Sequence, residues 1–412
     1  MSTEGLPIVR IRDVQTILTA PNGIRLVVVK VITDQPGLYG LGCATFTQRP
    51  LAVAAAVEHY LKPFALGRDV SRIEDLYQAA YVSSYWRSGP VLNNALSGLD
   101  QALWDIKGKL AGMPVYQLLG GKCREAVPVY VHASGDTFSE VEERARAFME
   151  QGFRYVRCQV GITGMSTYGS HGGGGMAALD REQTRTWEPS AYVHTIPQLF
   201  EYLRVKLGED VELMHDVHER VPAIQGVWLA KALEPYRLFF LEDLFAPEDV
   251  GYFAQVRQQC ATPLAMGELF VNQAEYVPLI QQRLIDFIRV HISDIGGFTM
   301  ARKLAAFCEF MGVRTAFHGP GDVSPIGHAA NMHLDLAVSN FGIQELALFR
   351  DDTRAVFPGT PEVHDGCMWP NDRPGWGVDV DEKLAAEFPF PEDRYNGAWP
   401  EIRSWDGTVI RP

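Results

Sequence analysis

The sequence predicts an α/β protein in which a small α+β module precedes a (β/α)8 barrel. Three observations favour this fold. The chain has 412 residues, too many for one ordinary domain of about 150 residues, and the length suits a large barrel with a smaller companion. Strand patterns followed by helical patterns occupy the chain up to Gly120-Gly121. Beyond that pair, short apolar runs alternate with helix-length segments, which is typical of a parallel β/α barrel.

Three β-rich runs open the chain, separated by turn-forming Pro and Gly residues: Ile8–Leu18, Ile24–Thr33 and Tyr39–Thr47. The clearest helix follows at Leu92–Leu110, where leucine and isoleucine recur at spacings of three and four. Gly112-Met113-Pro114 ends it. Strands followed by helices predict an α+β module, which we place at residues 1–125.

The barrel is expected over residues 126–358. Its eight predicted strands are Val127–His132, Tyr155–Gln159, Val211–His218, Leu238–Glu242, Leu264–Leu269, Phe287–Ile292, Thr315–His318 and Phe341–Gln344. One segment interrupts the alternation: Gly161–Pro189 is long, polar and rich in glycine, which is typical of a lid or a mobile loop. The remaining residues, 359–412, are rich in Pro, Gly, Trp and Asp and are expected to pack on the first module.

The composition excludes several classes of partner. Lys and Arg number 37 against 50 Asp and Glu, a formal net charge of −13, which disfavours nucleic acid and anionic membranes. No apolar run is long enough to span a bilayer, and the first residues lack a signal-peptide core. Six scattered cysteines without a C-x-x-C pair indicate reduced thiols and a cytoplasmic protein.

Three acidic residues stand at the ends of successive predicted barrel strands. They are Asp216 in LMHDVH, Glu242 in FFLED and Glu268 in AMGEL, at intervals of 26 residues, about one β/α unit. In this fold the catalytic groups come from the C-terminal ends of the strands. Carboxylates gathered at one rim repel one another, and a hard divalent cation with oxygen ligands relieves the repulsion. The sequence therefore predicts one Mg²⁺ per subunit, although any single acid has the simpler alternative of a strand-end ion pair.

Two histidines and a glutamate are further candidates at this rim. His218 lies two residues after Asp216, and because alternate residues of a strand share a face, we expect it to point into the same mouth as a general acid. A histidine hydrogen-bonded at a strand end is an equal alternative. His318, in FHGPGD, is a second candidate acid, and Glu345, in GIQE, could hydrogen-bond a substrate hydroxyl.

The second predicted strand carries Arg157 and Gln159 on one face, and Tyr168 follows in the Gly-rich loop. A tyrosine with a pKa of about 10 is a poor base at neutral pH. An adjacent guanidinium favours the phenolate and lowers that pKa. Arg157 with Tyr168 is therefore a possible base, while from spacing alone Tyr168 is more simply a loop aromatic.

Longer motifs run in order along nearly the whole chain. YWRSGPVLNNALSGLDQALWDIKGKLAGMPVYQLLGG precedes the barrel, and HDVHER, FFLED, PLAMGELF, RLIDFIRVHISDIGG, HGPGDVSPIGHAANMHLDL and NFGIQE lie within it. This series resembles the enolase superfamily of the mandelate racemase type, and within it the mannonate dehydratase group, also called the D-galactonate dehydratase family. The resemblance implies a modified TIM barrel with an N-terminal α+β capping domain that the C-terminal tail completes.

The resemblance also implies a reaction, in which the proton α to the carboxylate of a sugar acid is removed and the 3-hydroxyl leaves as water, giving a 2-keto-3-deoxy acid. It assigns roles residue by residue: Mg²⁺ ligands Asp216, Glu242 and Glu268; a base formed by Tyr168 with Arg157; the acid His218; active-site polar residues His318 and Glu345; and the substrate contact His132.

Two departures from the racemase pattern disfavour a two-base racemase. The Lys-x-Lys of the racemases on strand two is here Arg157-Cys158-Gln159, and their sixth-strand Asp, the partner of the seventh-strand His, is replaced by His291.

A further departure concerns the substrate. Active mannonate dehydratases read G-D-A-T-L-N-G-R after the third strand, whereas residues 42–49 read GCATFTQR, so Thr47 replaces an asparagine that would touch the substrate, next to Arg49. The interval from Arg157 to Tyr168 is also one residue shorter.

The main hypothesis is therefore a Mg²⁺-dependent hexonate dehydratase, a carbon–oxygen lyase acting on a small acid sugar. A divergent member with an unknown substrate and little activity on D-mannonate is the second hypothesis, and a non-catalytic metabolite-binding protein is the third. The resemblance further implies a homo-oligomer, a tetramer or an octamer.

Overall fold

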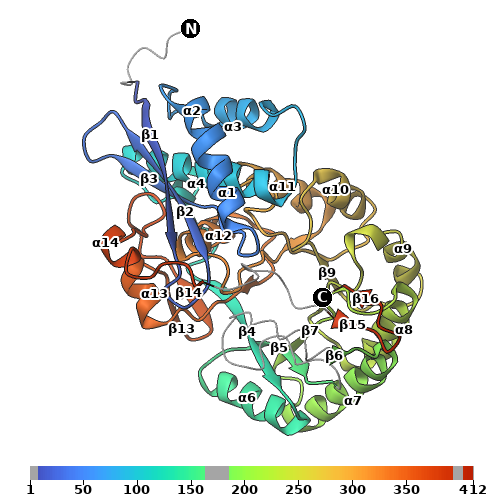
Figure 1. The fold of residues 1–412 in the computed structure, drawn as a ribbon. Coiled ribbons are helices and arrows are strands. Elements are labelled where there is room, and N and C mark those ends of the chain that lie inside the picture. The colour runs from blue at the N-terminus through green and yellow to red at the C-terminus, as the bar shows by residue number, and fades with distance from the viewer. Residues whose placement is uncertain (1–7, 163–184, 393–401, 412) are drawn as a thin grey trace.

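The computed structural model describes residues 8–162, 185–392 and 402–411. Figure 1 shows two parts: a cap at the N-terminus, in blue to cyan, and a barrel that follows in green to orange. The prediction of a capped α/β barrel is confirmed by this arrangement.

The cap is a three-stranded antiparallel sheet covered by helices. Strand β2 (Leu26–Thr33) lies between β1 (Ile11–Thr19) and β3 (Tyr39–Cys43). The long helix α4 (Pro90–Ala111) packs across β3 and β2. The other elements of the cap are α1 (Pro50–Ala56), the π-helical turn η1 (Val57–Leu61), α2 (Lys62–Ala65), α3 (Ile73–Val82) and α5 (Val115–Leu118).

Helix α4 lies unusually close to the sheet because glycine occupies the contact positions. A Cβ atom on Gly42 of β3 would lie 2.1 Å from the carbonyl oxygen of Gly98, and one on Gly98 would lie 2.4 Å from a methyl carbon of Val29. Any side chain at either residue would therefore push the helix off the sheet. The YGLGC run of β3 is thus a strand whose glycines fix the distance to α4.

The barrel has a parallel strand at each of the eight predicted positions. In ring order they are β4 (Val127–Gly135), β5 (Tyr155–Val160), β7 (Glu212–Asp216), β8 (Phe240–Glu242), β9 (Leu264–Met266), β10 (Phe287–Ile288), β11 (Arg314–Thr315) and β12 (Gln344–Glu345). Pairing of β12 with β4, and a bridge between Thr315 and Phe341, complete the ring. Several strands are shorter than predicted. The candidate site residues on these strands therefore lie just beyond the last residue that pairs with a neighbouring strand.

A helix follows each of the first seven barrel strands and covers the ring from outside. These are α6 (Phe138–Glu150), α7 (Pro189–Leu207), α8 (Ala223–Leu233), α9 (Tyr252–Arg257), α10 (Gln273–Gln281), α11 (Phe298–Met311) and α12 (Pro325–Ala337), with short 3-10 turns η2 (Glu234–Tyr236) and η3 (Pro247–Asp249). Inside the ring, Tyr130 of β4 and Phe240 of β8 meet with ring centroids 6.0 Å apart, although their strands are not neighbours. The interior is therefore filled by side chains, as in other barrels of this size.

The tail takes two paths. The hairpin β13 (Glu362–His364) and β14 (Cys367–Trp369) extends the barrel sheet beside β4, and residues 375–388, with α14 (Glu382–Ala385), lie against the cap, where the Trp376 indole donates to the carbonyl of Leu41. Helix α13 (Asp351–Val356) precedes them. The last strands, β15 (Ile402–Arg403) and β16 (Val409–Ile410), instead pair with β6 (Arg185–Thr186) on the barrel side (Figure 1). The middle part of the tail therefore contacts the cap, and its last strands pair on the barrel side.

Two further properties of the described chain bear on the sequence predictions. All six cysteines are free thiols. Among the described residues, no helix is both long and apolar enough to cross a membrane.

Candidate active site at the barrel mouth

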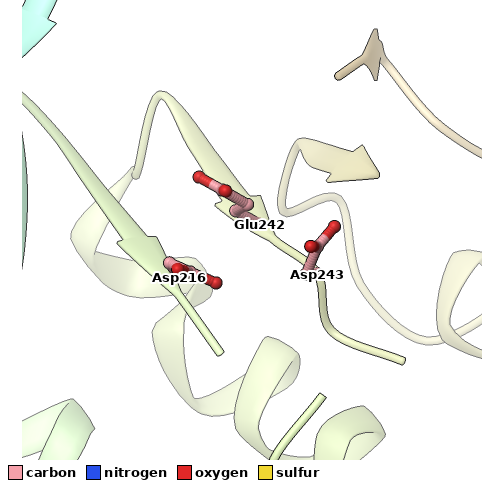
Figure 2. A group of neighbouring side chains, drawn as sticks. All are labelled: Asp216, Glu242 and Asp243. Atoms are coloured by element: carbon pink, nitrogen blue, oxygen red, sulfur yellow. The ribbon is translucent and has the colours of Figure 1, made fainter. Parts of the chain in front are cut away.

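Three buried carboxylates converge at the C-terminal ends of two adjacent barrel strands. Asp216 is the last residue of β7 and is paired in register with Glu242, the last residue of β8, and Asp243 follows directly. Figure 2 shows the three side chains together, and each offers an oxygen within 4.8 Å of the others. Hard divalent cations prefer oxygen ligands, and several carboxylate oxygens converge here.

Asp243 was not singled out from the sequence, and the backbone explains why. Strand alternation places residue 243 on the face opposite Glu242. The strand ends at Glu242, however, and Asp243 adopts a left-handed conformation with φ of 42°. This turn directs the carboxylate back toward the mouth. A charged residue immediately after a strand-end acid was the available signal in FFLED.

Glu268 lies at the same mouth, among basic and imidazole groups. It follows β9 by two residues. Its carboxylate is 2.7 Å from Nη1 of Arg289 and 3.4 Å from Nε2 of both His218 and His318. At 11% exposure its side chain is more open than those of Asp216 and Glu242, which are fully buried. The role of Glu268 as the third metal ligand stays a prediction.

Arg289, one residue past β10, is a central group that the sequence reasoning missed. Its guanidinium is fully buried and contacts three carboxylates: Glu242 at 2.9 Å, Glu268 at 2.7 Å and Glu345 through a short contact from Nη2. It also donates to the hydroxyl of Tyr130. A lone arginine inside the apolar run DFIRVHI was the signal, because a buried guanidinium requires acidic partners.

The predicted base partner Arg157 is the second buried guanidinium. From β5 its Nη1 lies 3.3 Å from Asp216, 3.4 Å from Glu242 and 3.6 Å from Glu345. Gln159, two residues along, donates its side-chain amide to the backbone carbonyl of Asp216 at 3.3 Å. Both residues therefore face the mouth, as the alternation on β5 predicts. Tyr168 lies outside the described residues.

The mouth carries a surplus of negative charge. Five carboxylates, from Asp216, Glu242, Asp243, Glu268 and Glu345, face the guanidiniums of Arg157 and Arg289, a formal charge of −3 with neutral imidazoles. Burial, reinforced by neighbouring carboxylates, raises the pKa of both Glu242 and Asp243 well above the ordinary values. Oδ2 of Asp243 has no hydrogen-bond partner among the described residues. Such a site favours a divalent cation, because uncompensated buried charge is costly.

The candidate histidines line the same mouth by different routes. Strand β7 ends at Asp216, so the alternation argument does not extend to His218. Its backbone instead turns with φ of 54°, and its amide donates to Oδ1 of Asp216 at 2.8 Å. His132 on β4 lies 2.9 Å from Glu345, whose other oxygen is 4.0 Å from His318. The structure thus brings these side chains together on the acid cluster, and their catalytic roles stay predictions.

Two loops of the cap carry barrel contacts or sequence departures, and the first of them contacts the loop after β11. Ile24 packs at the strand-seven loop, where a Cβ on Gly321 would lie 3.1 Å from its methyl carbon. In the second loop, the hydroxyl of Thr47 is 3.0 Å from Oε1 of Gln48, and Arg49, which is exposed, donates to the carbonyl of Gln48. Both proposed specificity residues are therefore bonded within their own loop.

Comparison with known proteins gives a consistent family. Residues 6–120 match the mandelate racemase / muconate lactonizing enzyme N-terminal domain, and residues 140–384 match the enolase C-terminal domain-like family. A D-galactonate dehydratase family member from Pantoea ananatis is 54% identical over 419 residues, covering 98% of this chain and 99% of that protein. Another, from Musicola paradisiaca, is 53% identical over 420 residues with the same coverage.

The solved structures agree. The crystal structure of an enolase from Pantoea ananatis with bound D-gluconate and Mg has a TM-score of 0.92 with this fold. It is 54% identical, and the match covers 98% of this chain and 100% of that one.

Proposed function

The chain belongs to the D-galactonate dehydratase family of the enolase superfamily, and from that membership we propose that it is a Mg²⁺-dependent acid-sugar dehydratase. The reaction is the removal of the proton α to the carboxylate and the loss of the 3-hydroxyl as water, which makes the enzyme a carbon–oxygen lyase. The observation that carries this proposal is the charge surplus at the barrel mouth, where buried carboxylates outnumber buried guanidiniums.

The donor set fits Mg²⁺. Asp216, Glu242 and Glu268 are the proposed ligands, with Asp243 as a further donor beside Asp216 and Glu242, and all four residues offer carboxylate oxygens. When bound, Mg²⁺ supplies Lewis-acid stabilisation of the negative charge that develops as an α-proton leaves. The relative from Pantoea ananatis, crystallised with D-gluconate and Mg, supports the same cofactor and substrate class here.

The chain's own residues supply the proton transfers. Arg157, buried against Asp216 and Glu242, is the proposed partner of Tyr168, the proposed base, because a guanidinium beside a tyrosine favours its phenolate. His218, whose Nε2 lies 3.4 Å from Glu268, is the proposed acid that protonates the departing hydroxyl. His318 is the second proton donor at the mouth. His132, Gln159 and Glu345 are the proposed polar contacts to the sugar.

The proposed substrate is a hexonate such as gluconate, galactonate or mannonate. The experiment is a screen of aldonates with Mg²⁺, read by formation of the 2-keto-3-deoxy product. Glu242→Gln is expected to lower kcat at least about 10³-fold, because it removes a ligand charge while keeping the shape of the side chain. Asp379→Asn, which changes an exposed carboxylate beside Tyr39, is the control and is expected to leave turnover unchanged. Absence of turnover on every aldonate would contradict the proposal.

A divergent substrate is the second candidate, and one observation favours it. Thr47 and Arg49 are held within their own loop by Gln48, so the cap presents a different edge to the sugar from the asparagine-containing pattern of mannonate dehydratases. On this candidate the substrate is an acid that the sequence does not identify, and D-mannonate is turned over slowly or not at all. Efficient D-mannonate turnover would exclude it.

Self-association is part of the proposal, as a tetramer or an octamer. Two aromatic side chains in the loop before α4, Tyr85 and Trp86, are 76% and 81% exposed in the single chain. Exposed aromatic pairs of this kind are typical of interfaces. Analytical sedimentation measures the oligomeric state of the wild type and of Trp86→Ser, and the variant is expected to associate less. A monomeric wild type would contradict the proposal.

A further inference from the structure

Strands β5 and β7 stop pairing before either strand ends. The last pair in their register is Arg157 with Met214. Continuing the register would pair Gln159 with Asp216, and both residues still belong to their strands. The buried backbone carbonyls beyond the last pair therefore need hydrogen-bond donors other than the neighbouring strand. The two strands thus part at the residue that is a proposed metal ligand.

Side chains take the place of the missing backbone pairs. Nδ1 of His215 lies 2.9 Å from the carbonyl oxygen of Cys158. The carbonyl of Asp216 is contacted by two side chains, the amide of Gln159 and the hydroxyl of Tyr192, each at 3.3 Å. The Tyr192 hydroxyl also lies 2.6 Å from Nε2 of His215. One hydroxyl therefore contacts both an imidazole and the backbone at the end of β7.

Tyr192 comes from helix α7, outside the barrel, and neighbouring rings hold it in place. Its ring centroid lies 5.3 Å from that of Trp187, whose indole donates to the carbonyl of Arg220 at 2.8 Å. The His215 ring contacts the rings of both Tyr192 and Phe200, with centroids 5.8 and 5.5 Å away. Tyr192 is 5% exposed and His215 is 1% exposed. Loss of the Tyr192 hydroxyl would therefore leave buried polar atoms without a partner, which is costly.

The end of β7 carries two groups of the proposed site. Oδ2 of Asp216 lies 3.3 Å from Nη1 of Arg157, and Oδ1 accepts from the amide of His218 at 2.8 Å. Because the Asp216 carbonyl belongs to the peptide that leads to His218, a shift of that peptide would move both side chains.

We propose that Tyr192 is a positioning residue whose hydroxyl holds this peptide where the strands part, and so sets the Asp216 carboxylate for Mg²⁺ and His218 for proton transfer. The inference rests on the proposed function for the roles of Asp216 and His218. It adds a residue of the outer helix layer to the groups on which the mouth depends.

A matched pair of tyrosine variants tests this role. Tyr192→Phe removes the hydroxyl and keeps the ring. Tyr202→Phe is the control, because Tyr202 lies on the same helix and its hydroxyl donates to Glu142 of the outer helix α6 at 2.8 Å. In calorimetric titrations of the metal-free protein with Mg²⁺ alone, the Kd is expected to rise about 10-fold or more in Tyr192→Phe and to change less than about twofold in Tyr202→Phe. With an aldonate that the wild type turns over, kcat of Tyr192→Phe at saturating Mg²⁺ is expected to fall about 10-fold, with KM changed less than about threefold.

A second measurement needs neither metal nor turnover. Hydrogen exchange of the backbone amides in residues 212–219 is followed by mass spectrometry without Mg²⁺. We expect slow exchange in the wild type and in Tyr202→Phe, and exchange about fivefold faster or more in Tyr192→Phe. Fast exchange already in the wild type overturns the inference, and so does equal exchange or an equal Mg²⁺ Kd in the two variants. If the exchange is as expected but the wild type binds no Mg²⁺ or turns over no aldonate, the role of Tyr192 at the strand end stands and the proposed function fails.

Discussion

The barrel mouth and the interface between cap and barrel both bury polar side chains, but they differ in whether those side chains find enough partners within the protein. At the interface, Asp105 of α4 accepts from the amides of Leu41 and Trp376 and from Lys109, and Asp100 accepts from the amide and the hydroxyl of Thr299. At the mouth, five carboxylates face two guanidiniums. Buried polar groups that satisfy one another hold two parts of a fold together, whereas a buried surplus of one charge indicates a ligand.

The largest expected effect comes from increasing the excess of negative charge at the barrel mouth. Arg289→Met removes a fully buried guanidinium and leaves Glu242, Glu268 and Glu345 without it, so the free energy of unfolding without metal is expected to fall by about 3–5 kcal/mol. Urea unfolding in EDTA measures it. Arg302→Met, which breaks an exposed pair with Glu74, is the control and is expected to cost about 0–1 kcal/mol. Equal losses in the two variants would contradict the contrast between mouth and surface.

The second largest effect is expected from neutralising this negative charge with a cation. Mg²⁺ at about 100 times its Kd is expected to stabilise the native state by about 2.7 kcal/mol, because it binds the folded mouth and not the unfolded chain. Thermal unfolding in Mg²⁺ against EDTA measures the shift. Glu242→Gln is expected to reduce it strongly. A wild type whose Tm is the same in both conditions would show that the acid cluster does not hold the cation.

A change at the interface is expected to be smaller and independent of metal. Three groups donate hydrogen bonds to the Asp105 carboxylate. Asp105→Asn replaces one acceptor oxygen by an NH2 group, so one of these donors loses its acceptor, at a cost of about 1–3 kcal/mol in the free energy of unfolding. The Mg²⁺ shift in Tm is expected to remain, since Asp105 belongs to the cap. Loss of that shift in Asp105→Asn would mean that the two regions are coupled more tightly than their contacts suggest.

The smallest expected effect is a pH slope. Burial raises the pKa of Asp100 to about 7 from an ordinary 3.8. Between pH 4 and 7 the folded chain therefore keeps a proton that the unfolded chain has lost, and the free energy of unfolding falls as pH rises, by up to about 1.4 kcal/mol per pH unit. Urea unfolding at pH 5, 6 and 7 is expected to show a shallower fall in Asp100→Asn than in the wild type. An identical slope would place the Asp100 pKa near its ordinary value.

Several elements of the fold were predictable because their signals are local. Short apolar runs between helix-length segments marked all eight barrel strands, and the spacing of three and four marked helix α4. The regular interval between Asp216, Glu242 and Glu268 indicated one rim, since it equals one β/α unit and strand ends of a barrel share a rim. The tail was less predictable, because its path depends on which exposed edge, β4 or β6, each short strand meets.

The sequence by itself therefore determined the barrel, the cap and the position of the acid cluster, all of which follow from periodicity and chain spacing. Only the tertiary structure showed that Asp243 enters the cluster, through a left-handed turn that strand alternation does not anticipate. It also placed Arg289 among three carboxylates and His291 against His318. These contacts join residues from different strands, and their geometry is set by the closure of the ring, which no local pattern encodes.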